Sequence, residues 1–317
     1  MAILLRESDV EQLANMAMAI DAVEEAFRLQ GEKKAENAPR RRCRFERGLL
    51  HVMSASLPTK GLAGLKSYSS VEGKTRFHVL LYSGEDGRLL AVMEGDMLGR
   101  LRTGAATGVA TKYMARTDAS KVGIIGTGGQ ARTQLQAVCA VRPVSSIMAY
   151  GRNREHCEQF CQEMSQVLQM HVEPVPGPEQ AVREQDIVIT ATHSKEPVLK
   201  GEWLAKGTHL NAIGSNHLIR QEIDVEAVRR CDCVVVDSAE QAMLESGDLT
   251  RAVEAGAFYW EDARELGLVV TGDFPGREDA GEITLFKSLG IALEDVALAG
   301  AIYRAAAKAG AGESLPL

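Results

Sequence analysis

No apolar run in this 317-residue sequence approaches the roughly 20 residues that a helix needs to cross a bilayer. An excess of basic residues is also absent. The net charge of −7 argues against nucleic acid or an anionic membrane as the main partner. The first residues, M-A-I-L-L-R-E-S-D, lack the longer apolar run of a signal peptide, and we therefore expect a cytoplasmic protein.

Metal-ligand patterns are lacking as well. The six cysteines are scattered, with Cys157 and Cys161 one helical turn apart and Cys231 and Cys233 alternating along a predicted strand. Neither pair has a matching cluster of cysteine or histidine, and the seven histidines form no ligand pattern. We predict no metal and reduced, buried thiols. Hydrophobic content of 45% and 25% charged residues are those of an ordinary globular protein, long enough for two domains.

The most informative stretch is residues 121–132, K-V-G-I-I-G-T-G-G-Q-A-R. A short apolar run with β-branched residues predicts a buried strand. It ends in G-x-G-x-x-A and continues into helix-forming residues, Thr133 to Ala140. Gly126 allows a tight turn, Gly128 lets the backbone approach a pyrophosphate, and Ala131 permits close packing of the helix. An ordinary strand-turn-helix connection is the alternative, but the flanks on both sides favour a dinucleotide site.

Upstream of this motif, alternating residues predict an antiparallel sheet. Its expected strands are Leu49–Met53, Leu62–Tyr68, His78–Tyr82 and Leu89–Glu94. The second of them carries Lys66, which has two interpretations. It is either a strand-end charge that reaches water or a lysine held in a pocket as an acid, a base or a carboxylate partner. Spacing alone favours the first.

Two segments that carry arginines also have two interpretations each. In a basic run, Arg40, Arg42 and Arg44 would share one side of a strand, either as a solvated face or with one side chain in an anion site. Residues 98–116 predict a helix rich in small residues, with Arg102 near its N-terminal end. Arg102 is either an ordinary surface residue or an inward residue that faces the substrate.

The second strand of the dinucleotide fold, Ser146 to Tyr150, ends in G-R-N-R. An NAD-binding fold usually places an acid there for the ribose 2′-hydroxyl, and none is present. Arg152 can instead pair with a 2′-phosphate, or it merely begins the following helix. We predict NADP(H) as the preferred cofactor, with NAD(H) as the alternative.

Short strands and helices continue to alternate downstream, as in a doubly wound sheet whose ligands bind at the C-terminal strand ends. Thr192 and the loop Gly214 to Asn216 are expected to face the nicotinamide. We also expect a short helix near Pro178 to Glu184, a long helix from Glu294 to Ala307, and a frayed end from Ala309 to Leu317.

In this order, the pieces resemble the ornithine cyclodeaminase/μ-crystallin family over nearly the whole chain. The resemblance rests on Leu65-Lys66, Arg102 to Ala106, Gly126 to Ala131, Gly214 to Asn216 and Thr284 to Asp295. It implies an α/β protein, with a Rossmann doubly wound sheet plus an α+β domain. Residues 1–118, completed by a C-terminal helix at 294–317, would bind the substrate and form a homodimer, and residues 119–293 would bind NAD(P).

The resemblance also implies residue roles. In the family, an arginine after proline, a strand-end lysine and the arginine of an R-T motif grip the substrate carboxylate beside the nicotinamide. These roles fall on Arg40, Lys66 and Arg102. Arg41 and Arg42 adjoin Arg40 and stay alternatives to it.

One departure from the family bears on the chemistry. Cyclodeaminases carry an aspartate in the loop after the fifth Rossmann strand, where it handles the substrate amine and the attacking nitrogen. Here that residue is Asn216, and an amide cannot take a proton or balance an ammonium as a carboxylate does. The absence of an acid at the ribose position also argues against a cyclodeaminase. Cyclodeaminases keep a tightly held NAD⁺, whereas several relatives use exchangeable NAD(P)H to reduce imines.

We therefore predict an NAD(P)-dependent oxidoreductase, an imine reductase or amino-acid dehydrogenase, acting on a small imine carboxylate such as 1-pyrroline-2-carboxylate. Lys66, or a water that it orders, is the candidate proton donor. The alternatives are an ornithine cyclodeaminase and a non-enzymatic, NADPH-dependent small-molecule binding protein. The candidate catalytic residues are Lys66, Arg40, Arg102 and Asn216, and the candidate cofactor-binding residues are Thr103, Gly126, Gly128, Gly129, Gln130, Ala131, Arg152, Thr192, Ile213 and Ser288.

Overall fold

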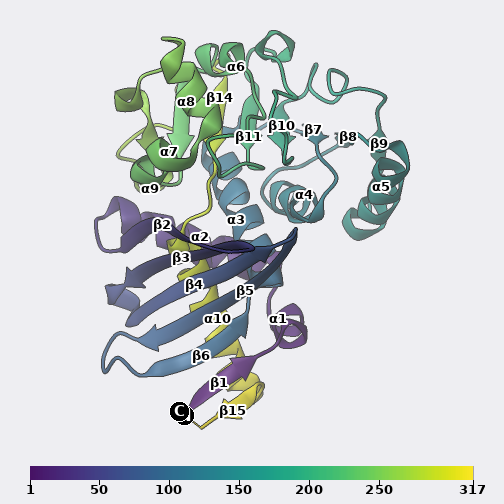
Figure 1. The fold of residues 1–317 in the computed structure, drawn as a ribbon. Helices are drawn as coiled ribbons and strands as arrows, with labels where there is room; N and C mark the ends of the chain where they lie inside the picture. The colour runs from purple at the N-terminus through teal and green to yellow at the C-terminus, as the bar shows by residue number, and fades with distance from the viewer. Residues whose placement is uncertain (317) are drawn as a thin grey trace. The chain divides into compact units, whose positions relative to one another are not determined.

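The computed structural model describes residues 1–316 and divides into two compact units (Figure 1). The first unit comprises Met1–Ala105 with Gly290–Leu317, and the second comprises Ala106–Leu289. The division falls inside helix α3 (Asp96–Met114), so residues 106–118 belong to the second unit. The predicted domain bounds and the role of each domain stay predictions. Every helix among the described residues is too short or too polar to cross a membrane.

A seven-stranded sheet forms the frame of the first unit, in the order β15-β1-β6-β5-β4-β3-β2. Its strands are β1 (Ala2–Leu5), β2 (Glu36–Phe45), β3 (Gly48–Leu57), β4 (Leu62–Val71), β5 (Lys74–Ser83), β6 (Leu89–Glu94) and β15 (Glu313–Leu315). Strands β2 to β6 pair antiparallel in sequence order, which confirms the predicted antiparallel sheet. Three of the four predicted strands are longer than expected, because ladder hydrogen bonds extend through polar residues where the alternation fades.

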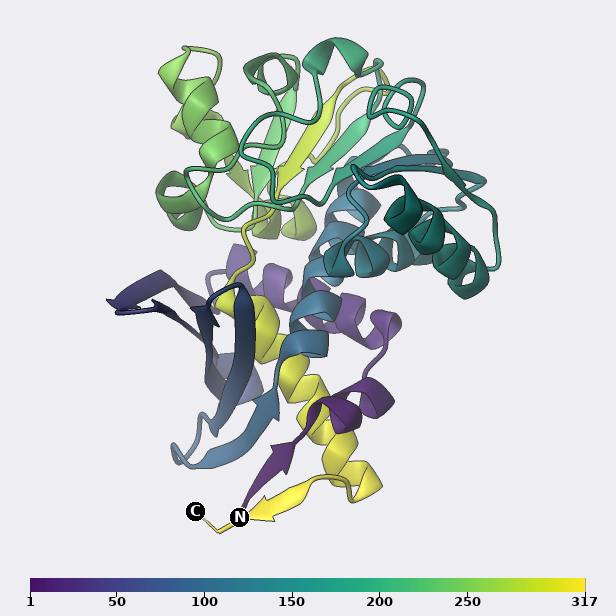
Figure 2. The same cartoon turned by 45° about the vertical axis from the view of Figure 1, so that its right-hand side comes forward.

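The helices of the first unit pack on one face of this sheet (Figure 2). They include α1 (Glu7–Leu13), α2 (Met16–Gly31) and α10 (Ala292–Ala309), with a short 3₁₀ turn η1 (Pro58–Lys60) before β4. Gly64 of β4 lies directly under α10, since a methyl group there would be 3.0 Å from Val296. Because side chains alternate along a strand, Leu62, Gly64 and Lys66 face α10, and Leu65 lies on the opposite face.

The expectation of a frayed C-terminus is wrong. Helix α10 ends at Gly310, whose φ of +65° turns the chain into the left-handed region that favours glycine. The chain then returns as β15 and pairs antiparallel with β1. Both strands are only three or four residues long. Their pairing joins the two ends of the sequence, which a local pattern does not reveal.

An eight-stranded parallel sheet forms the second unit, in the order β13-β12-β14-β11-β10-β7-β8-β9. Its strands are β7 (Lys121–Ile125), β8 (Ser146–Tyr150), β9 (Val172–Pro174), β10 (Ile187–Thr190), β11 (His209–Ala212), β12 (Cys233–Val236), β13 (Arg264–Glu265) and β14 (Thr284–Lys287). The helical segments are α4 (Gly129–Val141), α5 (Arg154–Leu168), η2 (Gly201–Trp203), α6 (Val225–Arg229), α7 (Ala239–Glu245), α8 (Gly247–Glu254), η3 (Trp260–Asp262) and α9 (Leu266–Thr271). This is the predicted doubly wound Rossmann sheet, and its strand order reverses between β7 and β10.

Two local predictions fail in this unit. Residues 178–184 form successive turns instead of a helix, with Glu184 at a φ of +60° ending them. Strand β14 was not predicted, although it lies between β11 and β12. Its four residues, T-L-F-K, give no periodic signal, and all four are buried because strands on both sides and helices on the faces enclose them.

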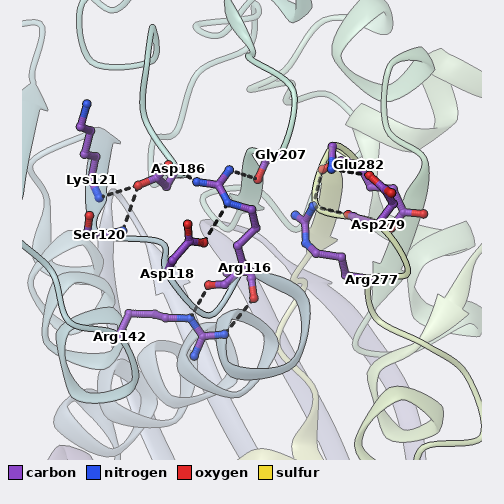
Figure 3. A network of polar contacts seen from close by, with 12 residues as sticks. Arg116, Asp118, Ser120, Lys121, Arg142, Asp186, Gly207, Arg277, Asp279 and Glu282 are labelled. Carbon is purple, nitrogen blue, oxygen red and sulfur yellow. Dashed lines mark hydrogen bonds and ion pairs between the residues drawn. The ribbon is translucent and has the colours of Figure 1, made fainter.

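A polar network holds the chain in place where the first strand of this sheet, β7, begins (Figure 3). Asp186 accepts hydrogen bonds from the backbone N–H groups of Ser120 (2.9 Å) and Lys121 (3.0 Å) and from the guanidinium of Arg116 (2.6 Å). Burial alone would raise the pKa of Asp186, but these donors outweigh it and hold that pKa below its usual value. Arg142 donates to the carbonyls of Thr111, Lys112 and Ala115, each at 2.9 Å, at the end of α3. These carbonyls lie at the C-terminal end of the helix, where acceptors run out of backbone partners, although Thr111 O also accepts the N–H of Ala115 at 3.1 Å.

Replacing Arg142 with methionine should therefore lower the free energy of unfolding by about 2 kcal/mol, since several helix-end carbonyls lose a charged donor. Urea denaturation measures the change. Arg154→Met is a matched control, because Arg154 is almost fully exposed and pairs only with Glu158 one turn away. Equal stability of Arg142→Met and the control would contradict this role.

Candidate active site

The glycine turn of the second unit has the shape that a dinucleotide phosphate needs. Gly126 has a φ of +114°, and a methyl group there would overlap the carbonyl oxygen of Ala191. Gly128 is the N-cap residue of α4, and no side chain caps the helix. A methyl group at Gly128 would meet nothing within 4 Å, so there is open space beside the residue that precedes Gly129 and Gln130, the first residues of α4. These features fit a pyrophosphate at the helix N-terminus.

Arg132 stabilises the same turn, and the sequence analysis did not identify it. Its guanidinium donates to the carbonyl of Gly128 at 3.1 Å and forms two hydrogen bonds with Glu163 of α5, at 2.8 and 2.6 Å. The hydrogen bond from Arg132 lowers the pKa of Glu163. An arginine in the first turn of a helix gives no sequence signal for this role, because its partner is one helix away.

Arg152 is exposed and directly follows β8. It does not begin the next helix, because Asn153 is the N-cap of α5 and accepts a hydrogen bond from His156 N–H at 2.9 Å. A methyl group at Gly151 would lie 2.7 Å from the hydroxyl of Thr127. The segment that carries Arg152 is therefore in contact with the glycine turn, where the second strand of such folds meets the ribose.

Other predicted cofactor residues lie at neighbouring strand ends. Thr192 follows β10, and Ile213 follows β11 and donates to Thr190 O at 2.9 Å. Ser288 follows β14, and its hydroxyl donates to Asp237 at 3.3 Å. Ala131 is fully buried in α4, as close helix packing requires. Thr103 belongs to the first unit, and its hydroxyl donates within α3 to Gly99 O at 2.7 Å.

The three predicted carboxylate-binding residues converge in the first unit on the start of α10. Lys66 Nζ lies 2.8 Å from Oδ1 of Asp295, and Arg102 Nε lies 3.0 Å from the same oxygen. A second nitrogen of Arg102 lies 2.7 Å from Glu294. Arg40 donates to Gly290 O at 2.8 Å. Among the neighbouring arginines of β2, Arg40 is the buried one, beside a register shift in the β2–β3 pairing, whereas Arg41 and Arg44 are exposed.

Lys66 is only 2% exposed, so it is not a strand-end charge that reaches water. Burial lowers the pKa of Lys66 to about 8, against the opposing charge of Asp295 and with help from Arg102 and Arg40. The sequence analysis did not single out Glu294 or Asp295 as site residues. Acids in the first turn of a helix look like ordinary partners of the helix dipole.

The cluster gathers buried cations that could bind an anion. Arg40, Lys66 and Arg102 are three cations against the carboxylates of Glu294 and Asp295, all of them less than one tenth exposed. Oδ2 of Asp295 is buried and has no hydrogen-bond partner among residues 1–316. A substrate carboxylate would find cationic partners in this cluster, and a donor on the same molecule would satisfy this oxygen.

One wall of this cluster is aromatic. The ammonium of Lys66 lies 5.1 Å from the ring centroid of Phe77. Tyr68 lies 5.1 Å from Phe77 and stacks on His51 with centroids 4.1 Å apart. These three rings share the face of the sheet that carries Lys66, since His51 pairs with Tyr68 and Tyr68 with Phe77. Asn216 belongs to the second unit and is partly exposed in the loop after β11, the fifth strand of that sheet in chain order.

Comparisons with known proteins identify the family of this chain. The family model described as "Ornithine cyclodeaminase/mu-crystallin family" matches residues 2–310. The alanine dehydrogenase of Archaeoglobus fulgidus is 38% identical over 324 residues, which cover 99% of this chain and 98% of that protein.

Two solved structures share the whole fold. The Delta(1)-pyrroline-2-carboxylate reductase of Thermococcus litoralis, in complex with NADH and L-proline, superposes with a TM-score of 0.95 at 38% identity and covers 99% of this chain and 100% of its own. An archaeal alanine dehydrogenase dimer with bound NAD has a TM-score of 0.94 at 38% identity and covers 100% of this chain and 99% of its own. This chain belongs to the ornithine cyclodeaminase/μ-crystallin family.

Proposed function

We propose that this protein is an NAD(P)H-dependent imine reductase or amino-acid dehydrogenase that acts on a small imine carboxylate. The observation that carries the proposal is the buried cluster in which Lys66 and Arg102 meet at one oxygen of Asp295, with a lysine whose pKa is lowered to about 8. The relative solved with NADH and L-proline holds the reduced cofactor and the amino-acid product of such a reaction, and its fold extends over the whole of this chain.

In the proposed reaction, Arg40 and Arg102 bind the substrate carboxylate and hold the imine in one orientation. The bound nicotinamide cofactor supplies the hydride. The ammonium of Lys66 donates a proton to the imine nitrogen, which leaves the carbon electrophilic. A pKa of about 8 suits this role, because the ammonium and the neutral amine are both accessible near neutral pH.

For the cofactor, NADP(H) is proposed over NAD(H). The support is the exposed Arg152 after β8 and the contact of Gly151 with the glycine turn, without an acid at the usual ribose position. Relatives bind NADH or NAD, so binding of both cofactors by this chain is compatible with the family. Arg152→Glu should reverse the preference, which the ratio of kcat/KM for NADPH and NADH measures.

The direct test is consumption of NADPH and NADH over a panel of cyclic imine carboxylates and of 2-oxo acids with ammonia or methylamine. Oxidation of NADPH with 1-pyrroline-2-carboxylate is the expected result. Ammonia release from ornithine without added reductant would instead make the protein a cyclodeaminase despite Asn216. Tight ligand binding with no cofactor consumption on any imine would make it a binding protein.

The pH dependence of kcat should report the titration of Lys66. Below about pH 8 the side chain is an ammonium, so imine reduction should be fast there and should fall as the pH rises through this value. Amino-acid oxidation needs the neutral amine to accept a proton, so its rate should rise over the same range. Initial rates in both directions across a pH series measure this opposition. Parallel profiles in the two directions would exclude Lys66 as the group that moves the proton.

We also propose a homodimer, formed through the face of the first-unit sheet opposite α10. Leu65, Leu80 and Val92 lie side by side across β4, β5 and β6 on that face, each partly exposed. Such an apolar row is typical of a surface covered by a partner. The structural relative described as a dimer supports a second copy as that partner.

Leu80→Glu should therefore shift the protein toward the monomer, because a carboxylate would be buried against an apolar surface in the assembly. Sedimentation velocity measures the change. Thr75→Glu is a matched control on the same strand, at its exposed end. Two variants with the same sedimentation coefficient would show that the interface is elsewhere.

A further inference from the structure

A single buried carboxylate joins two strand-end loops in the second unit. Glu222 is fully buried. Its Oε1 accepts hydrogen bonds from the backbone N–H of Thr192 at 2.6 Å and from the Thr192 hydroxyl at 2.9 Å. Its Oε2 accepts the backbone N–H of Gly214 at 2.6 Å. The loop after β10 and the loop after β11 are therefore held by the two oxygens of one side chain.

These loops lie at the point where the strand order of the sheet reverses. Gly126, at the end of β7, packs against Ala191 and lies close to the Thr192 methyl, since a Cβ on Gly126 would be 3.2 Å from it. A methyl group at Gly214 would overlap the backbone of Thr192. The glycine turn, Thr192 and Gly214 are thus in direct contact. In an open parallel sheet, ligands bind outside the carboxyl ends of the strands at this reversal.

Glu222 is itself held in place by charged groups behind it. Its backbone N–H and that of Ile223 donate to Oδ1 of Asp248, at 2.6 and 3.1 Å. Oδ2 of Asp248 lies 3.1 Å from Nζ of Lys287, which also donates to Ser215 O at 2.9 Å in the loop after β11. Glu222, Asp248 and Lys287 are all fully buried. A network in which each member has a partner fixes its geometry, and the low dielectric strengthens every bond.

We infer that Glu222 is a positioning residue for the nicotinamide end of the cofactor. Glu222 would hold the nicotinamide end in place through Thr192 and Gly214. These residues belong to the two loops that would border this end, while the glycine turn would bind the pyrophosphate. This inference rests on the proposed function for the identity of the ligand. It goes beyond that function in assigning the alignment of the nicotinamide half to a residue that lies behind the loops.

The test is Glu222→Gln. Both carboxylate oxygens accept N–H or O–H donors, so an amide must turn its NH₂ toward either Thr192 or Gly214, and one loop loses its acceptor. We expect the Kd for the reduced cofactor to rise about tenfold, the equivalent of one charged hydrogen bond. The Kd for ADP-ribose, which has no nicotinamide, should stay unchanged. Fluorescence titration measures both without turnover.

Asp224→Asn is a matched control in the same segment. Asp224 accepts two backbone N–H groups, from Gly201 at 2.9 Å and Ala227 at 2.7 Å, both on Oδ1, which asparagine retains. This variant should bind both ligands as the unaltered protein does. If Glu222→Gln does not fold, Thr192→Val removes one of the three bonds to Glu222 and should give a smaller loss with the same selectivity.

Equal weakening of the reduced cofactor and of ADP-ribose would overturn the inference, because Glu222 would then merely hold the fold together. An unchanged Kd for both ligands would overturn it as well. These outcomes are separate from a failure of the proposed function. If the protein binds NADH or NADPH but reduces no imine, the proposed reaction is wrong. The difference between the Kd changes for the reduced cofactor and for ADP-ribose still decides the role of Glu222.

Discussion

Replacing Lys66 with alanine should lower kcat about 1000-fold and leave the affinity for NADPH nearly unchanged. The side chain is buried against Asp295 and the Phe77 ring in the first unit, so its loss removes the proposed proton donor. The glycine turn belongs to the second unit, and its hydrogen bonds do not involve Lys66. Steady-state rates with 1-pyrroline-2-carboxylate and fluorescence titration with NADPH measure the two quantities separately.

Lys60 provides the control for this experiment. It lies just before β4, the strand that carries Lys66. Its side chain is 43% exposed and pairs with Glu25 at 2.7 Å. Lys60→Ala should keep the full rate, because an exposed pair contributes little to stability and Lys60 is not in the cluster. A normal kcat in Lys66→Ala would exclude Lys66 as the donor.

The second large effect is expected for Arg102→Met, which should raise KM for the imine carboxylate about 100-fold. Arg102 bridges Glu294 and Asp295, so its removal also takes a cationic partner from two buried carboxylates. The site then lacks one of the cations proposed to bind the substrate carboxylate. Arg102→Lys should give an intermediate KM, since an ammonium keeps the charge but cannot reach both acids in the fork geometry of a guanidinium.

The substrate supplies an internal control for Arg102. The cyclic imine 1-pyrroline has no carboxylate, so its kcat/KM should change little between the unaltered protein and Arg102→Met, whereas that of 1-pyrroline-2-carboxylate should fall. An equal fall for both imines would mean that Arg102 stabilises the cluster without binding the carboxylate.

The contrast between Lys66 and the glycine turn explains what the sequence can predict. The turn is encoded within residues 121–132, because strand, glycines and helix start are consecutive, and the structure has this arrangement. The antiparallel strands are local in the same sense. Lys66 is different, since its partner Asp295 is 229 residues further along the chain, and spacing within a strand favoured a solvent-exposed side chain.

The unpredicted parts share this dependence on distant residues. Strand β14 exists because β11 and β12 flank it, and β15 because β1 is available to pair. Glu222 resembled any acid before a short helix, and only the fold brings Thr192 and Gly214 to its two oxygens. The resemblance to a family supplied Arg40, Lys66 and Arg102, and the structure brings all three to the start of α10.

The first unit is discontinuous in sequence, and this determines the order in which the two units can fold during synthesis. When the ribosome has made residues 1–289, the second unit is complete in sequence, but Glu294, Asp295 and the rest of α10 do not yet exist. Until then the cations of Lys66 and Arg102 have no acids to meet, and the sheet has no helix α10 to cover its inner face. The second unit can therefore fold during translation, whereas the first unit, which begins earlier in the sequence, must wait for α10.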